Sequence, residues 1–288
     1  MSPQPRPAPV DFGRSADDYA RFRGGFPPAL FDRLEAAFAV ERPGRRLLDV
    51  GTGTGALARE FARRGWLVTA TDPSADLLAQ AREQDIEACI EVAYLQHPAE
   101  HSELPTASFD VVTAGRCWHW FDRAAAAAEI RRLLVPAGIL AIAHFDRVVV
   151  APGSVLETTQ KLVERWNPDW AKSPPMTFGG GVGLYPDWVR DLARAGFRDI
   201  ETFSFDVTVG YTHESWRGRV RSGGGVGPSL CAEQVAALDA ELDALLKREF
   251  PAEPLLVTHR AFATLGRSPR LQGRETQAEL GGQLAARQ

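Results

Sequence analysis

The sequence contains few cysteines, no long apolar run and no large excess of either charge. Its three cysteines, Cys89, Cys117 and Cys231, are odd in number and widely spaced, which excludes a disulfide framework or a zinc knuckle built from them alone. A membrane-spanning helix needs roughly 20 consecutive apolar residues, whereas the best run, residues 138–145, has the length of a strand. We therefore expect a soluble protein of the reducing cytoplasm.

Basic and acidic residues nearly balance, with 33 Lys and Arg against 37 Asp and Glu and a net charge of -4. This composition lacks the basic footprint with which proteins hold a nucleic-acid backbone or an anionic membrane. The first ten residues contain four prolines and no apolar block, which is typical of a flexible arm and not of a secretory signal. The expected partner is a small molecule, with no nucleic acid and no membrane.

Strand-like and helix-like segments alternate along the middle of the chain. Apolar runs predict strands, and helical periodicity predicts helices between them, in the order 45–50 (strand), 56–64 (helix), 66–71 (strand), 74–83 (helix), 109–114 (strand), 124–134 (helix) and 138–145 (strand). Strands that alternate with helices form a parallel sheet covered on both faces. The predicted fold class is α/β, a doubly wound and mostly parallel sheet.

The flanking segments depart from this alternation. Helical spacing over residues 17–38 predicts two short helices, an N-terminal flap, and the Trp-, Pro- and Gly-rich residues from about 150 to 188 predict an inserted cap. A further helical insertion at about 210–250, with a long amphipathic helix at 232–249, separates two strands at 201–209 and 255–264 that can pair as a hairpin-like edge. The predicted organisation is an arm at 1–16, one domain at 17–266 and a mobile tail at 267–288.

Two identical Gly-Gly-Gly-Val-Gly pentapeptides occur at residues 179–183 and 223–227. Neither is followed by the Lys-Ser/Thr pair that a phosphate-binding P-loop needs. Both predict flexible loops, which is the usual meaning of a glycine cluster.

A glycine-rich turn follows the first predicted strand. Residues 47–55 read Leu-Leu-Asp-Val-Gly-Thr-Gly-Thr-Gly, so that three alternating glycines open a helix. Glycine lets the backbone approach a ligand closely, and the helix start presents unpaired N–H groups to it. Asp72 lies 21 residues after Gly51 (72 - 51), at the end of the second strand, where a carboxylate can accept hydrogen bonds from a ribose diol. The pattern predicts a nucleoside ligand.

The turn by itself fits two kinds of cofactor. Gly51, Gly53 and Ala56 satisfy the Gly-x-Gly-x-x-Gly/Ala pattern of dinucleotide enzymes, which leaves an NAD(P)-dependent oxidoreductase open. Asp49 stands immediately before the turn, and a fixed negative charge there suits an ammonium-bearing ligand better than a pyrophosphate.

These residues resemble the class I S-adenosylmethionine-dependent methyltransferases. The first motif of that family, acidic-x-Gly-x-Gly-x-Gly, is matched by Asp49, Gly51, Gly53 and Gly55. Residues 98–112 look like the second and third motifs of its small-molecule type 11 branch, and the Trp-His-Trp-Phe-Asp run at 118–122 looks like a signature of that branch. The nearest named group is that of the trans-aconitate methyltransferase-like proteins. The resemblance covers about residues 17–145 and implies a seven-stranded Rossmann-like methyltransferase fold.

The resemblance implies S-adenosyl-L-methionine as the cofactor and methyl transfer to a small-molecule acceptor. Asp49 and the glycines would hold the methionine part, Asp72 the ribose, and Ala99 with Glu100 the adenine edge. Tyr19 and Arg23 resemble a Tyr and an Arg that close over the cofactor in the family. The full predicted cofactor set is Tyr19, Arg23, Asp49, Gly51, Thr52, Gly53, Gly55, Asp72, Pro73, Ala99, Glu100, Gly115 and Arg116.

Aromatic residues provide the candidate substrate site. Ligands of open parallel sheets bind beyond the carboxyl ends of the strands, where Trp118 and Trp120 follow the third strand, although both could simply pack over the sheet edge. Aromatic residues of the cap form either a small core or the walls of a pocket. The predicted substrate-binding set is Trp118, Trp120, Trp166, Trp170, Phe178 and Tyr185.

His119 is the candidate general base, because it lies in the Trp-His-Trp-Phe cluster and histidine titrates near neutral pH. His144 is the competitor, and His119 could instead only orient the substrate, since methyl transfer can proceed by positioning. Residues 97–101 spell the His-x-x-Glu-His pattern of a zinc-protease class, but Pro98 disfavours the required helix, so no metal is expected. A non-catalytic protein that binds S-adenosylmethionine and regulates stays open as an alternative.

Overall fold

The computed structural model describes residues 18, 21–22, 24–40, 43–149, 151–171 and 182–270. Several predictions concern positions outside the described residues: the arm at 1–16, Tyr19, Arg23, Phe178, most of the first pentapeptide and the tail from 271 onward. In the part of the chain that is described, no helix is long and apolar enough to cross a membrane.

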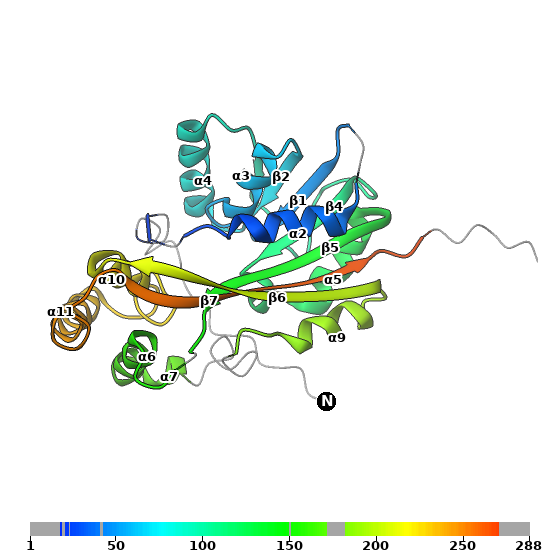
Figure 1. Cartoon of the computed structure of the whole chain (residues 1–288). Coiled ribbons are helices and arrows are strands. Elements are labelled where there is room, and N and C mark those ends of the chain that lie inside the picture. Colours follow the sequence, from blue (N-terminus) through cyan, green and yellow to red (C-terminus); the bar gives the residue numbers. More distant parts are fainter. Residues whose placement is uncertain are drawn as a thin grey trace, which may run out of the picture.

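One sheet forms the centre of the protein (Figure 1). Its strands are β1 (Arg46–Val50), β2 (Leu67–Thr71), β3 (Ala93–Leu95), β4 (Phe109–Gly115), β5 (Leu134–Arg147), β6 (Arg198–Tyr211) and β7 (Leu255–Arg267). They lie in the order β3-β2-β1-β4-β5-β7-β6, in which β1 to β5 pair in parallel and β7 pairs antiparallel with both β5 and β6. The predicted doubly wound, mostly parallel sheet of seven strands is confirmed, together with its antiparallel edge.

Nine α-helices flank the sheet in the described part of the chain, and several of them begin at a side-chain cap. They are α2 (Pro28–Phe38), α3 (Ala56–Arg63), α4 (Ala75–Ala88), α5 (Arg123–Leu133), α6 (Val155–Trp166), α7 (Pro168–Ala171), α9 (Pro186–Arg194), α10 (His213–Arg221) and α11 (Ala232–Glu249). Ser74, Asp122 and Ser154 cap α4, α5 and α6, because each side-chain oxygen accepts a hydrogen bond from an N–H of the first turn. The sequence prediction missed β3, which has three residues, and included the mostly polar α10 only within the helical insertion at about 210–250.

Two helical layers cover the sheet. On one face, Phe31 of α2 and Phe61 of α3 lie in a core cluster with β1, β2 and β7; on the other, Ile130 of α5 and Leu192 of α9 pack over β1, β4 and β5. Figure 1 shows α2, α3 and α4 on one side and α5 and α9 on the opposite side. Strand β4 is buried along almost its whole length, as expected for a parallel strand covered on both faces.

The remaining helices gather at one end of the sheet (Figure 1). Leu162 of α6, Trp216 of α10 and Leu242 of α11 are almost fully buried in one shared core cluster. We call α6, α7, α10 and α11 the helical lobe. The sequence predicted the cap and the second insertion as separate features, whereas the structure joins their helices around a common apolar core.

The predicted cap extends too far along the chain. Tyr185 and Trp188 fall inside its predicted range of about 150–188, but they stack on each other with ring centroids 4.1 Å apart and pack against Phe262 of β7. Both belong to the core under α9, not to the helical lobe.

The second pentapeptide is not a flexible loop. Within residues 223–227, Val226 is buried, and the Gly227 N–H donates to the Arg221 carbonyl at 2.9 Å. A Cβ atom at Gly224 would lie 2.6 Å from the Trp170 ring, and one at Gly225 would overlap the same ring. These glycines are therefore required for the close approach of Trp170.

Candidate functional site

A cavity lies at the carboxyl ends of β1, β2 and β4, where the strand order of the sheet reverses. Ligands of open α/β sheets bind at such a switch point. The cavity encloses about 690 Å³ of space between protein atoms, and this figure includes the part that is open to solvent. Its lining residues are Phe26, Asp49, Gly51, Thr52, Gly53, Thr54, Ala56, Leu57, Asp72, Leu77, Gly115, Arg116, Cys117 and Trp120.

The three glycines of the turn serve different purposes. Gly51, Gly53 and Gly55 all have positive φ angles, of +62°, +57° and +79°, which side chains disfavour. A Cβ atom at Gly51 would lie 2.8 Å from the Phe121 ring, and one at Gly55 would overlap the Tyr94 hydroxyl. Nothing lies within 4 Å of a Cβ atom at Gly53, which therefore borders open space in the cavity.

Asp49 is a buried carboxylate at the end of β1. It is 1% exposed and accepts hydrogen bonds from the hydroxyls of Thr52 (2.6 Å) and Thr113 (2.7 Å). Burial raises the pKa of Asp49 to about 6, while the two threonine hydrogen bonds oppose the shift and Asp72 adds to it. At neutral pH this group is mostly ionised and faces the cavity, where a cation would stabilise it.

Asp72 ties the end of β2 to the glycine turn. Its Oδ2 accepts the Gly53 N–H and its Oδ1 accepts the Ser74 N–H, both at 2.9 Å. Burial raises the pKa of Asp72, and these two backbone hydrogen bonds counteract the shift. Each oxygen has further lone-pair capacity, so the carboxylate can hold the turn and still accept hydrogen bonds from a ligand.

A buried ion pair supports the turn from behind. Arg59 of α3 pairs with Asp85 of α4 and donates to the carbonyls of Thr54 and Ala81, both at 3.0 Å. The Tyr94 hydroxyl donates to Asp85 at 2.8 Å. The sequence analysis missed this group, whose members come from three separate elements.

Eight of the predicted cofactor and substrate residues line the cavity: Asp49, Gly51, Thr52, Gly53, Asp72, Gly115, Arg116 and Trp120. Gly55 stands behind the turn, and Pro73 is exposed beside it. Ala99 is buried in the core of the other sheet face, and Glu100 accepts the Asp122 N–H at 2.7 Å at the start of α5. The ligand roles given to all of these residues, including the eight that line the cavity, stay predictions.

The predicted substrate residues lie in different places. Trp120 lines the cavity, and Trp170 of α7, which is not a lining residue, stacks on Trp120 with ring centroids 6.5 Å apart. Trp118 is fully buried and its Nε1 donates to Asp191 (3.1 Å). Trp166 donates from its Nε1 to Glu241 (2.9 Å) inside the helical lobe. Tyr185 stacks on Trp188 in the core of the sheet. In this structure Trp118, Trp166 and Tyr185 therefore pack within the protein.

The two candidate bases lie close together at the carboxyl ends of β4 and β5. The His119 ring is half-buried, with its centroid 4.9 Å from that of Trp120 and 6.0 Å from that of His144. Neither histidine belongs to the lining of the cavity described above. Residues 97–101, which carry the zinc-protease-like pattern, are not helical.

The sequence analysis missed six lining residues: Phe26, Thr54, Ala56, Leu57, Leu77 and Cys117. Phe26 is the most informative of them, because the Arg116 guanidinium lies 4.4 Å from its ring centroid and donates to the Gly24 carbonyl at 3.0 Å. In the sequence, Phe26 stands out only because it lies within the helix-breaking run Gly-Gly-Phe-Pro-Pro at residues 24–28.

Comparisons with known proteins agree with this geometry. The family described as "Methyltransferase domain" matches residues 48–142. An uncharacterized methyltransferase of Mycobacterium tuberculosis is 36% identical over 133 residues, which cover 46% of this chain and 51% of the relative. A ubiquinone biosynthesis O-methyltransferase of Xanthomonas oryzae is 31% identical over 199 residues, which cover 67% of this chain and 76% of the relative.

The solved structures give the same fold. A protein from Anaeromyxobacter dehalogenans named as a type II methyltransferase superposes with a TM-score of 0.58 at 24% identity, over 86% of this chain and 99% of the other. The chain belongs to the class I S-adenosylmethionine-dependent methyltransferases. It spans about half the length of the mycobacterial relative. Membership in the trans-aconitate methyltransferase-like group stays a prediction.

Gly53→Ala should weaken cofactor binding about tenfold or more, because the new methyl group enters the cavity from a strained backbone position. Gly65→Ala is the matched control: Gly65 also has a positive φ (+81°) and open space around it, but it lies between α3 and β2, away from the cavity. Calorimetric titration of both variants measures the difference. Equal affinities would remove Gly53 from the site.

Asp49→Asn should stabilise the ligand-free protein by about 1–3 kcal/mol at pH 7, since a native pKa of about 6 means that folding penalises the ionised carboxylate. That penalty is complete above pH 6 and vanishes below about pH 4, so the advantage of the variant should shrink as the pH falls between these values. Urea unfolding of both proteins from pH 4 to 7 measures it. A constant loss of stability across this range would contradict the account.

Proposed function

We propose that the protein transfers a methyl group from S-adenosyl-L-methionine to a small-molecule acceptor. The observation that carries this proposal is the cavity in which the ionisable carboxylate of Asp49 and the open space at Gly53 meet. An NAD(P)-dependent oxidoreductase would place a pyrophosphate at this turn, beside a negative charge that disfavours it.

The residues present fit the cofactor. Asp49 would hold the cationic methionine part, the N–H groups of the glycine turn would hold its carboxylate, and Asp72 would accept the ribose hydroxyls. When bound, the cofactor supplies an electrophilic methyl group on a sulfonium. The protein itself aligns the acceptor with that methyl group and keeps water away, which is the main requirement of such a transfer.

The side chains around the cavity suit a small acceptor with an apolar part. The indole ring of Trp120 lines the cavity, and Trp170 of the helical lobe stacks on that ring. Their electron-rich faces also favour a nearby cation. The Xanthomonas relative is named as an O-methyltransferase; if this chain also uses an oxygen acceptor, removal of a proton would accompany transfer, and His119 would accept it.

The cofactor is tested by calorimetric titration with S-adenosylmethionine and, in parallel, with NAD. Only the former should bind. Because its ammonium group favours ionised Asp49, its association constant should be steady from about pH 6 to about pH 7.5 and fall about tenfold per pH unit below pH 6. Asp49→Asn should bind weakly at every pH and lose this dependence. Tight binding of NAD would overturn the proposal, whereas cofactor binding without any formation of S-adenosylhomocysteine across an acceptor panel would favour a regulatory protein.

His119→Ala should reduce turnover by roughly 10² to 10⁴ if the histidine acts as a base, and should leave cofactor affinity nearly unchanged. The loss should shrink for acceptors that are already deprotonated at the assay pH. His144→Ala is the comparison variant for the neighbouring ring. A loss below threefold in His119→Ala would exclude it as the base and leave positioning as the main contribution.

A further inference from the structure

Asp18, Arg21 and Phe22 contact α10 of the helical lobe. We call the described residues between Asp18 and Phe26 the N-terminal segment. The Arg221 guanidinium of α10 donates to both carboxylate oxygens of Asp18, from Nε to Oδ2 at 2.8 Å and from a terminal nitrogen to Oδ1 at 3.0 Å. Arg21 and Glu214 form a second, highly exposed pair at 3.2 Å. A bidentate contact fixes both the orientation of the guanidinium and its distance, so it defines the position of the Asp18 carboxylate on α10.

Next to these ion pairs, the aromatic ring of Phe22 packs against Gly218 of α10. A Cβ atom at Gly218 of α10 would overlap the Phe22 ring, so that Phe22 rests directly on the helix backbone. Glycine inside a helix costs about 1 kcal/mol relative to alanine. The close approach of Phe22 explains why a glycine stands in the middle of α10.

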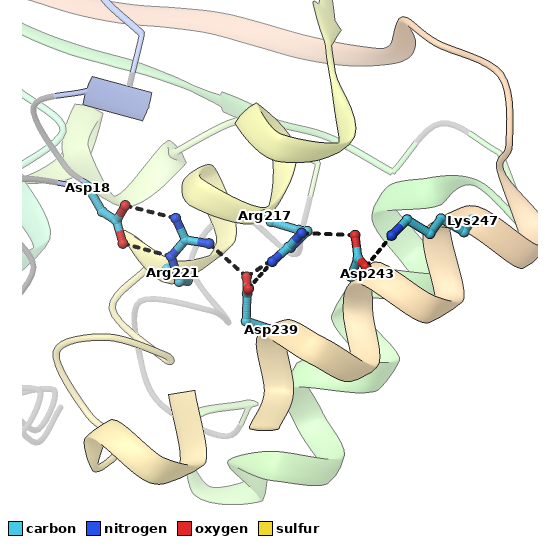
Figure 2. Close-up of polar contacts among 6 residues, drawn as sticks. All are labelled: Asp18, Arg217, Arg221, Asp239, Asp243 and Lys247. Carbon is cyan, nitrogen blue, oxygen red and sulfur yellow. Dashed lines mark hydrogen bonds and ion pairs between the residues drawn. The ribbon is translucent and has the colours of Figure 1, made fainter. Parts of the chain in front are cut away.

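Arg221 is itself held from behind by a chain of alternating charges (Figure 2). Its other terminal nitrogen donates to Asp239 of α11 at 2.7 Å, and Asp239 also pairs with Arg217. Arg217 continues to Asp243 at 2.8 Å. Arg221 therefore links the N-terminal segment to a network that spans α10 and α11.

The same segment reaches the cavity at its other end. Gly24 accepts a hydrogen bond from Arg116, and Phe26 lines the cavity. The described residues from Asp18 to Phe26 are thus anchored on the lobe at one end and on the cofactor cavity at the other.

We propose that Arg221 is a positioning residue that holds the N-terminal segment against the helical lobe through Asp18 and thereby slows the escape of the cofactor. This inference rests on the proposed function for the identity of the ligand. The pair is partly exposed, at 23% for Arg221 and 29% for Asp18, which limits its contribution to that of a well-oriented surface pair. We therefore expect an effect of about two- to fivefold on cofactor release, which is the range that such pairs give.

The experiment measures release of S-adenosylmethionine from the full chain by stopped-flow displacement. Arg221→Gln and Asp18→Asn should each raise the release rate about two- to fivefold, and the double variant should add nothing further because both changes remove the same contact. Wild-type release should accelerate with salt more than release from Arg221→Gln. In turnover assays, both variants should raise KM for the cofactor and leave kcat unchanged.

Arg217→Gln is the matched control. It removes two pairs of the same network, with Asp239 and Asp243, but leaves the contacts of Arg221 with Asp18 and Asp239 in place, so its release rate should stay much closer to that of wild type than the rate of Arg221→Gln. Gly218→Ala supplies a second route: it should favour the helix itself, and yet speed release by displacing Phe22. Normal release in Arg221→Gln and Gly218→Ala, or an equal acceleration in Arg217→Gln, would overturn the proposal.

A failure of the cofactor assignment would be recognised separately. If the wild-type protein binds no S-adenosylmethionine, hydrogen exchange over residues 18–26 replaces the release assay. Faster exchange there in Arg221→Gln than in Arg217→Gln would support the docking role of Arg221, and equal exchange would overturn it.

Discussion

The burial of the Asp49 carboxylate at the end of β1 is the constraint on which the site depends. The hydroxyls of Thr52, in the glycine turn, and Thr113, in β4, donate hydrogen bonds to this carboxylate. These hydrogen bonds stabilise the buried charge, and the one from Thr52 also holds the turn in place. Asp72 then fixes the turn from β2 through the Gly53 N–H. Two carboxylates in one cavity destabilise the empty protein and favour a cationic ligand, which is a trade of stability for function.

Around this centre, the structure uses glycine mainly to bring other groups close. Gly51 and Gly55 leave room for Phe121 and the Tyr94 hydroxyl, whereas only Gly53 borders open space. In the helical lobe, Gly218 admits Phe22 and the glycines at 224 and 225 admit Trp170, which in turn stacks on Trp120. The lobe thus contacts both the N-terminal segment and one wall of the cavity, so it supports the site from two sides.

Sequence periodicity predicted the parallel half of the sheet well, because buried parallel strands are continuous apolar runs between capped helices. It placed α11 at its observed bounds, 232–249, and ended β6 and β7 a few residues short. Eight predicted site residues line the cavity because they are consecutive in the turn or stand at strand ends. Trp118, Trp166 and Tyr185 were chosen by residue type, and aromatic rings fill cores as readily as pockets.

The sequence by itself determined the β1 turn, the acidic residue at the end of β2 and the class of fold, because each depends on residues within one strand, turn or helix. Only the tertiary structure decided which distant segments meet. Arg59 with Asp85, Arg221 with Asp18 and the shared core of α6, α10 and α11 join residues that no local pattern connects. Apolar burial and ion pairing act between any surfaces that chain topology brings together, so their partners become visible only after the chain has folded.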